Sequence, residues 1–172
     1  TRLAKLRSSE SSYDAIILAE AGLVRLALSL VDLWVLPLPK AWLLPAPTQG
    51  IIAIDYCKHR QDIGVMLGQI NHGPTACVAL VERAIMSFCG AFCGAPLGVL
   101  AQWVDQDIMA VEVAVPQPRG DIIYVSYEGA FGLESVGGYL GLGDYNLLHV
   151  LPFWRELTAV LMKHNVPSVV GF

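Results

Sequence analysis

Cys93 has the surroundings that best suit chemistry among the four cysteines of this sequence. It lies in the stretch 81–97, V-E-R-A-I-M-S-F-C-G-A-F-C-G-A-P-L, where a helix-like segment runs into a loop of small residues. A thiolate is a strong, soft nucleophile, so a cysteine in such a loop can carry a covalent group. The alternative is a small buried hydrophobic side chain, which is how most free cysteines behave. Cys89 lies about one helical turn earlier, but no further His or Cys pair at ligand spacing completes a zinc site.

Two other features carry polar groups or glycines that resemble functional motifs. Glu82 and Arg83 lie beside the apolar stripe of the same helix-like segment, which predicts a structural pair bonded to loop backbone. The glycines within 137–143 lack a preceding strand and a following lysine, so we expect a flexible loop there and not a phosphate-binding loop.

Composition limits the class of protein. The chain has 172 residues, enough for one ordinary domain or two small ones. Its hydrophobic share is 55% and its mean hydropathy is +0.54, which indicates extensive burial or an apolar surface that needs a partner. The net charge of −4 argues against a nucleic-acid binder. The cysteine content favours a reducing, intracellular setting over a disulfide framework.

The first 70 residues are predicted to be an α/β piece. Residues 13–18 and 51–56 are short apolar runs bounded by turn residues, which predicts buried strands, and 19–30 has the apolar spacing of a helix. Residues 31–44 are apolar, but Pro37 and Pro39 interrupt them and they are too short to span a bilayer. We expect this segment to pack on a neighbour.

Residues 71–172 are predicted to be a compact α+β domain with helices on one face of a three-stranded antiparallel sheet. The elements expected are a short helix at 61–70 just before it, a helix at 73–89, a hairpin of 96–104 and 108–115, a strand at 121–128, an irregular run at 129–143 and a helix at 152–164.

Several motifs, in order along the chain, resemble the C-terminal part of the porphobilinogen deaminase (hydroxymethylbilane synthase) family. T-R-L-A-K-L at 1–6 resembles the end of R-G-N-x-x-T-R-L-x-K-L, and Y-D-A-I-I-L-A-E-A-G-L-V-R-L at 13–26 is similar to Y-D-A-I-I-L-A-x-A-G-L-x-R-L. L-P-A-P-T-Q-G at 44–50 is similar to L-P-A-x-G-Q-G, and N-H-x-x-T and E-R-A pieces follow. F-C-G-A-P-L-G at 92–98 resembles G-C-x-x-P-x-G.

The resemblance implies a specific activity. The family joins porphobilinogen units into linear hydroxymethylbilane, with release of ammonia, in tetrapyrrole (heme) biosynthesis. It implies a transferase whose dipyrromethane cofactor is held covalently by Cys93, with Gly94 beside it, because a thiolate can add to the azafulvene left when porphobilinogen loses ammonia. It also implies that Arg2 and Arg25 bind the acetate and propionate groups of the pyrroles, whereas the residue-level alternative for both is a solvated surface charge. The implied front piece is part of a periplasmic-binding-protein-like domain.

The sequence departs from the family pattern at several positions. Thr48 replaces a glycine, Cys57 stands where the family often has arginine, and Phe92 replaces a small residue beside the cofactor cysteine. No carboxylate matches the family's catalytic aspartate, so we assign no catalytic residue. We assign no metal ligand either, because no His or Cys pair at ligand spacing is present. The alternative hypothesis is a truncated or decayed relative without turnover of its own, acting as a structural or interaction protein or as half of a split enzyme. Under either hypothesis the expected protein partner is a missing N-terminal domain or a second chain, and the expected location is the cytoplasm, with organelle import left open.

Overall fold

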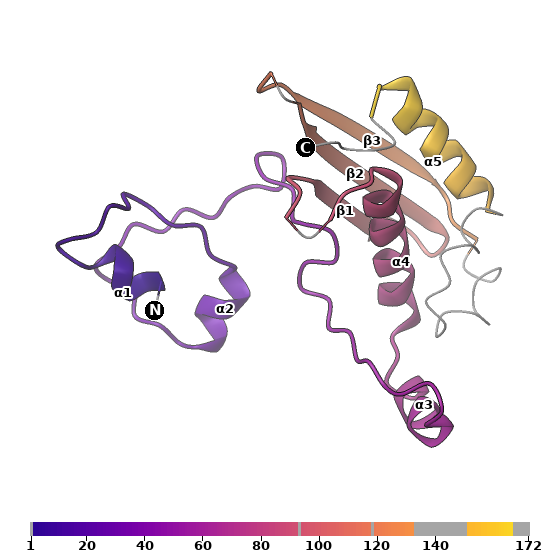
Figure 1. Cartoon of the computed structure of the whole chain (residues 1–172), viewed down its shortest axis with the longest axis horizontal. Helices are drawn as coiled ribbons and strands as arrows, with labels where there is room; N and C mark the ends of the chain where they lie inside the picture. The colour runs from indigo at the N-terminus through magenta and orange to yellow at the C-terminus, as the bar shows by residue number, and fades with distance from the viewer. Residues whose placement is uncertain (1, 93, 118, 133–150, 167–172) are drawn as a thin grey trace. The chain divides into compact units, whose positions relative to one another are not determined.

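The computed structural model describes residues 2–92, 94–117, 119–132 and 151–166 (Figure 1). They fall into two compact units, Thr1–Pro39 and Lys40–Phe172. Each unit is described below by itself. The domain division between residues 70 and 71 stays a prediction.

The second unit is built on a three-stranded antiparallel sheet in the order β1-β2-β3. β1 is Gly98–Trp103, β2 is Ile108–Pro116 and β3 is Ile122–Ala130. Leu100 lies opposite Glu112, and Val113 lies opposite Val125. Alternate side chains of a strand point to opposite faces, so the valines at 111, 113 and 115 share one face with Val125. The predicted hairpin and third strand are confirmed.

Two helices cover that apolar face. α4, Gly73–Phe88, packs against β1, and α5, Pro152–Lys163, packs against β3 (Figure 1). The two helices and the inner face of the sheet form one hydrophobic cluster. Its fully buried side chains include Val81, Ile85, Val99, Met109, Val111, Val113, Val115, Phe131, Phe153, Leu157 and Leu161. The prediction of helices on one face of an antiparallel sheet is confirmed.

The ends of α4 follow from its sequence. Pro74 lies in the first turn, where a backbone N–H would have no partner within the helix, so the N–H that proline lacks is not missed. Gly90, at φ +61°, ends the helix, because glycine adopts the left-handed region without a Cβ clash. The Ala91 N–H then donates to the Met86 carbonyl at 2.9 Å, which closes the end of the helix. The helix predicted at 73–89 is therefore confirmed.

The first unit contains two short helices, α1 (Arg2–Leu6) and α2 (Glu20–Arg25). The helix predicted at 19–30 is wrong in its length, because Ala27 at φ +46° interrupts the helical backbone. The strand predicted at 13–18 is also wrong: in the part of the chain that the structure describes, this run has no hydrogen-bonded neighbouring strand. An apolar run forms a strand only where a partner supplies the ladder.

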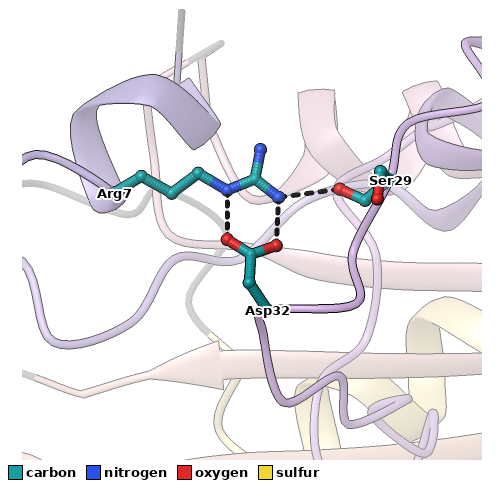
Figure 2. Close-up of polar contacts among 3 residues, drawn as sticks. All are labelled: Arg7, Ser29 and Asp32. Carbon is teal, nitrogen blue, oxygen red and sulfur yellow. Dashed lines mark hydrogen bonds and ion pairs between the residues drawn. The ribbon is translucent and has the colours of Figure 1, made fainter.

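An exposed ion pair joins two segments of the first unit that are distant in the sequence. The Arg7 guanidinium donates from Nε and Nη2 to the two oxygens of Asp32 at 2.7 and 2.6 Å, and Nη2 also donates to the Ser29 carbonyl at 2.7 Å (Figure 2). This fork geometry lowers the pKa of Asp32 and raises that of Arg7. The contact ties the end of α1 to the chain that follows α2.

Residues 51–56 are extended but not a strand, which corrects the second strand predicted in the front piece. Ile52 is 88% exposed, and within the described residues no strand pairs with this run. α3, Gln61–Gly68, follows and confirms the short helix predicted at 61–70. The irregular run predicted at 129–143 is wrong at its start, because β3 continues to Ala130. Its remainder from 133 onward lies outside the described residues.

Candidate functional site

The stretch around Cys93 joins α4 to β1. Cys93 itself lies outside the described residues, but its neighbours on both sides are described. The Ala95 N–H donates to the Phe92 carbonyl at 2.8 Å, and the Leu97 N–H donates to the Ala95 carbonyl at 2.9 Å. Phe92, Gly94 and Pro96 are exposed, whereas Leu97 is buried. The stretch is therefore anchored at its helix and strand ends and open to solvent around the cysteine.

Gly94 lies against the ring of Phe92. A Cβ added at Gly94 would lie 3.4 Å from Cε2 of Phe92, and Phe92 is 64% exposed. The aromatic side chain that replaces a small family residue therefore occupies space directly beside the cysteine loop. The role predicted for Gly94 stays a prediction.

Glu82 is the buried charged side chain of the described residues, at 4% exposure. Its Oε1 accepts the Ala101 N–H of β1 at 2.8 Å, and its Oε2 accepts the Thr48 N–H at 2.5 Å. Loss of water raises the pKa of this carboxyl, and the two N–H groups act in the opposite direction. The predicted bonding of Glu82 to loop backbone is confirmed.

The turn that Glu82 binds has a strained backbone. Thr48 lies at φ +60° and Gly50 at φ +84°. A β-branched residue rarely adopts the left-handed region, so the position that holds glycine in the family motif does call for glycine's freedom. In this conformation the Thr48 N–H donates to Glu82 Oε2.

The same segment approaches β1 closely. The Val99 N–H donates to the Pro45 carbonyl at 2.9 Å, and a Cβ on Gly98 would lie 2.8 Å from Cβ of Leu44. Leu44 is buried at 8% exposure. This contact was not predicted from the sequence. The glycine at the start of a predicted strand was the signal for it, since glycine in a strand often marks a close backbone approach.

Arg2 and Arg25 lie in the first unit, in α1 and at the end of α2. Both are exposed. Cys93 and Gly94 belong to the second unit. The carboxylate-binding role of the two arginines stays a prediction.

The remaining cysteines divide by burial. Cys77 and Cys89 are buried in and at the end of α4, and desolvation raises the pKa of each thiol to about 11. Cys57 is exposed. Across the described residues no three His, Cys, Asp or Glu side chains gather as a metal site would require, and no helix is long and apolar enough to cross a bilayer.

Comparison with known proteins shows which family the sequence matches. Residues 1–64 match the family described as "Porphobilinogen deaminase, dipyromethane cofactor binding domain". A probable porphobilinogen deaminase of Methanocaldococcus jannaschii is 39% identical over 116 residues, 67% of this chain and 38% of that protein. The chain belongs to the porphobilinogen deaminase family. Porphobilinogen deaminases of Ralstonia nicotianae and Streptococcus sanguinis are 38% identical over 120 residues and 35% identical over 135 residues.

These matches cover 70% and 78% of this chain and 35% and 43% of the two bacterial proteins. The chain thus spans about two fifths of the length of the curated porphobilinogen deaminases that it matches. The matched family is described as a dipyrromethane cofactor binding domain. The matched residues of this chain, 1–64, include Arg2 and Arg25. Cys93 lies beyond those residues, so cofactor attachment at Cys93 stays a prediction.

Proposed function

We propose that this chain serves the porphobilinogen deaminase reaction, in which porphobilinogen units are joined head to tail into linear hydroxymethylbilane with loss of ammonia. The chain is then a transferase of tetrapyrrole and heme biosynthesis. The observation that carries the proposal is the 35–39% identity to porphobilinogen deaminases across 67–78% of the chain.

Cys93 is the proposed attachment residue for the dipyrromethane cofactor, through a thioether. The described neighbours fit such a group, because Gly94 has no side chain and Phe92 and Pro96 face solvent. The buried Cys77 and Cys89 do not fit, since burial keeps their thiols protonated and inaccessible. When bound, dipyrromethane supplies the pyrrole carbon to which the next porphobilinogen unit is joined.

Arg2 and Arg25 are proposed to bind the carboxylates of the pyrrole side chains. A guanidinium donates two parallel hydrogen bonds to one carboxylate, which fixes its orientation as well as its position. Both side chains are exposed and thus open to a ligand.

The finer fold assignment belongs to the same proposal. Residues 1–70 would form part of a periplasmic-binding-protein-like α/β domain, and residues 71–172 would form the cofactor-carrying domain. The cytoplasm is the proposed location.

Turnover tests the proposal directly. The purified full chain is incubated with porphobilinogen, and porphobilinogen consumption and ammonia release are followed together. We expect both to proceed in equal amounts, to be lost in Cys93→Ser, and to persist in the matched control Cys57→Ser, which removes an exposed thiol elsewhere. Consumption that survives Cys93→Ser unchanged would contradict the assigned role of Cys93.

A different observation supports a second candidate function. Val31 is 96% exposed, Trp34 is fully exposed and Trp42 is 67% exposed. Apolar surface of this kind is typical of a protein interface. In this candidate the chain is a structural or interaction protein, or one half of a split enzyme, without turnover of its own. Consumption of porphobilinogen by the isolated chain would exclude it.

A further inference from the structure

The outer edge of β1 is covered by hydrogen-bond acceptors that come from two other parts of the chain. Among the residues that the structure describes, β1 is an edge strand, since β2 alone pairs with it. Of its outward N–H groups, that of Val99 donates to the Pro45 carbonyl and that of Ala101 donates to Glu82 Oε1. These two N–H groups are therefore not available to a further strand.

Glu82 connects three segments through one carboxylate. The side chain comes from the middle of α4, one oxygen holds β1 at Ala101, and the other holds the 44–50 segment at Thr48. A buried carboxylate that accepts two backbone N–H groups is a short, directional link. It is also costly to disrupt, because the buried Ala101 N–H would then lose its partner away from water, while the Thr48 N–H is half-buried.

The link bridges the two ends of the Cys93 stretch. α4 ends at Phe88, β1 begins at Gly98, and Cys93 lies between them in the sequence. Glu82 belongs to the helix before the stretch and binds the strand after it. The Glu82–Ala101 bond therefore adds a polar restraint on the separation of the two anchor points to the apolar packing of α4 on β1. The Pro45–Val99 bond adds a second restraint next to Gly98.

We propose that Glu82 is a positioning residue for Cys93: by joining α4 to β1 it holds the two ends of the Cys93 loop at a fixed separation. The proposal rests on the proposed function only for the identity of the group that Cys93 carries. Glu82 does not touch that group. It acts through the loop, as supporting residues of functional sites commonly do.

The test measures every cysteine of the full chain by peptide-resolved mass spectrometry. Glu82→Gln removes the charge and leaves one acceptor oxygen, and Glu82→Asp keeps the charge on a shorter side chain. Glu156→Gln is the matched control, because Glu156 also accepts a hydrogen bond, from the Tyr127 hydroxyl at 2.7 Å, but joins α5 to β3 and not α4 to β1. The readouts are the fraction of Cys93 that carries a covalent adduct and the iodoacetamide alkylation rate of each free thiol.

We expect both Glu82 variants to lower the adduct fraction at Cys93 by about tenfold, since displacement of a reacting group by about 1 Å costs a rate of that order or larger. The free thiol of Cys93 should be alkylated faster than in the wild type, because the ends of its loop are no longer held by the Glu82–Ala101 bond. Cys77 and Cys89 should stay protected, because the core around them is intact. Glu156→Gln should match the wild type at Cys93.

Three results would overturn the proposal. The first is wild-type behaviour of Cys93 in both Glu82 variants. The second is a parallel rise at Cys77 and Cys89, which would show general loosening of the fold. The third is loss of folding in both variants, which would make Glu82 a folding residue. If the wild type carries no adduct, the proposed function fails, while the alkylation rates still decide the role of Glu82.

Discussion

Thr48 occupies a backbone conformation that costs a β-branched residue free energy, at φ +60°. Glycine adopts this region freely, and the backbone N–H that Glu82 accepts would remain in Thr48→Gly. We expect Thr48→Gly to raise the free energy of unfolding by about 1 kcal/mol. Urea denaturation measures the change.

The converse substitution is the control for Thr48→Gly. Gly50 lies at φ +84°, and a Cβ added there meets no atom within 4 Å. Gly50→Ala therefore changes backbone strain alone and should lower stability by about 1 kcal/mol. Equal stability of Thr48→Gly and the wild type would show that the turn bears no strain.

The raised pKa of Glu82 predicts a pH dependence of stability. The folded protein binds a proton at Glu82 that the unfolded chain has already lost just above the ordinary pKa of 4.5. The contribution of Glu82 to the free energy of unfolding is therefore fully present below pH 4.5 and is lost as pH rises through the folded-state pKa. Melting curves of wild type and Glu82→Gln between about pH 4 and 8 measure it.

The stability of the wild type relative to Glu82→Gln should fall as pH rises through that window and level off above it. A difference that grows with pH would give the opposite sign and would mean that the two N–H groups outweigh desolvation.

Cys77 and Cys89 should react slowly with alkylating agents. With a pKa of about 11, each buried thiol is ionised only to about one part in a thousand at pH 8. The exposed Cys57 should be labelled first, and the rates at Cys77 and Cys89 should rise when the chain is unfolded. Peptide mapping after timed alkylation checks this order, and early labelling of Cys89 would contradict the burial of the end of α4.

At the scale of elements, the contact between β1 and the 44–50 segment carries a prediction. A Cβ on Gly98 would lie 2.8 Å from Cβ of Leu44 and 3.4 Å from Cβ of Ala114. Gly98→Ala should therefore push the segment off the edge of β1 and destabilise the protein by about 1–3 kcal/mol.

Gly68→Ala is the matched control for Gly98→Ala, because a Cβ at the end of α3 meets no atom within 4 Å. Alanine favours the helix, so this control should be neutral or slightly stabilising. Denaturation midpoints of the two variants give the comparison, and similar midpoints would refute the close approach at Gly98.

The elements that the sequence predicted correctly are those with a strong period and clear ends. α4 has one apolar stripe, with Pro74 in its first turn and Gly90 just after its end. In β2, valines occupy alternate positions along the strand. Both patterns are local, and both elements bury their apolar face within the same unit. Periodicity and turn chemistry were therefore sufficient to place them.

The elements that failed depend on partners that are distant in the sequence. The runs at 13–18 and 51–56 are apolar and bounded by turns, yet no described strand pairs with either. Their composition favours the extended backbone of a strand, but a hydrogen-bonded β-ladder forms only with a neighbouring strand. The end of α2 depends on the positive φ of Ala27, which no residue type signals.

The candidate site was predictable in part. The bonding of Glu82 to backbone followed from its place beside the apolar stripe, and the strain at Thr48 followed from a glycine motif. The partners of Glu82 were not predictable, because Thr48 and Ala101 reach it only through the tertiary fold. Cys93 lies outside the described residues, so its assignment rests on the motif.

At the scale of the whole molecule, the proposed groups are divided between two units. Arg2 and Arg25 belong to Thr1–Pro39, and the residues that flank Cys93 belong to Lys40–Phe172. The part that aligns with this chain is 38% of the Methanocaldococcus jannaschii protein and 35% of the Ralstonia nicotianae protein, so more than half of each lies outside the match. The covalent chemistry at Cys93 can be tested independently of the carboxylate-binding role of Arg2 and Arg25.

The intact mass of the natively purified full chain shows whether Cys93 carries dipyrromethane. We expect a covalent increment equal to a two-pyrrole group in the wild type and in Cys57→Ser, and the unmodified mass in Cys93→Ser. Peptide mapping should locate the increment at Cys93. An unmodified Cys93 in the freshly purified wild type, or the same increment in Cys93→Ser, would contradict the account.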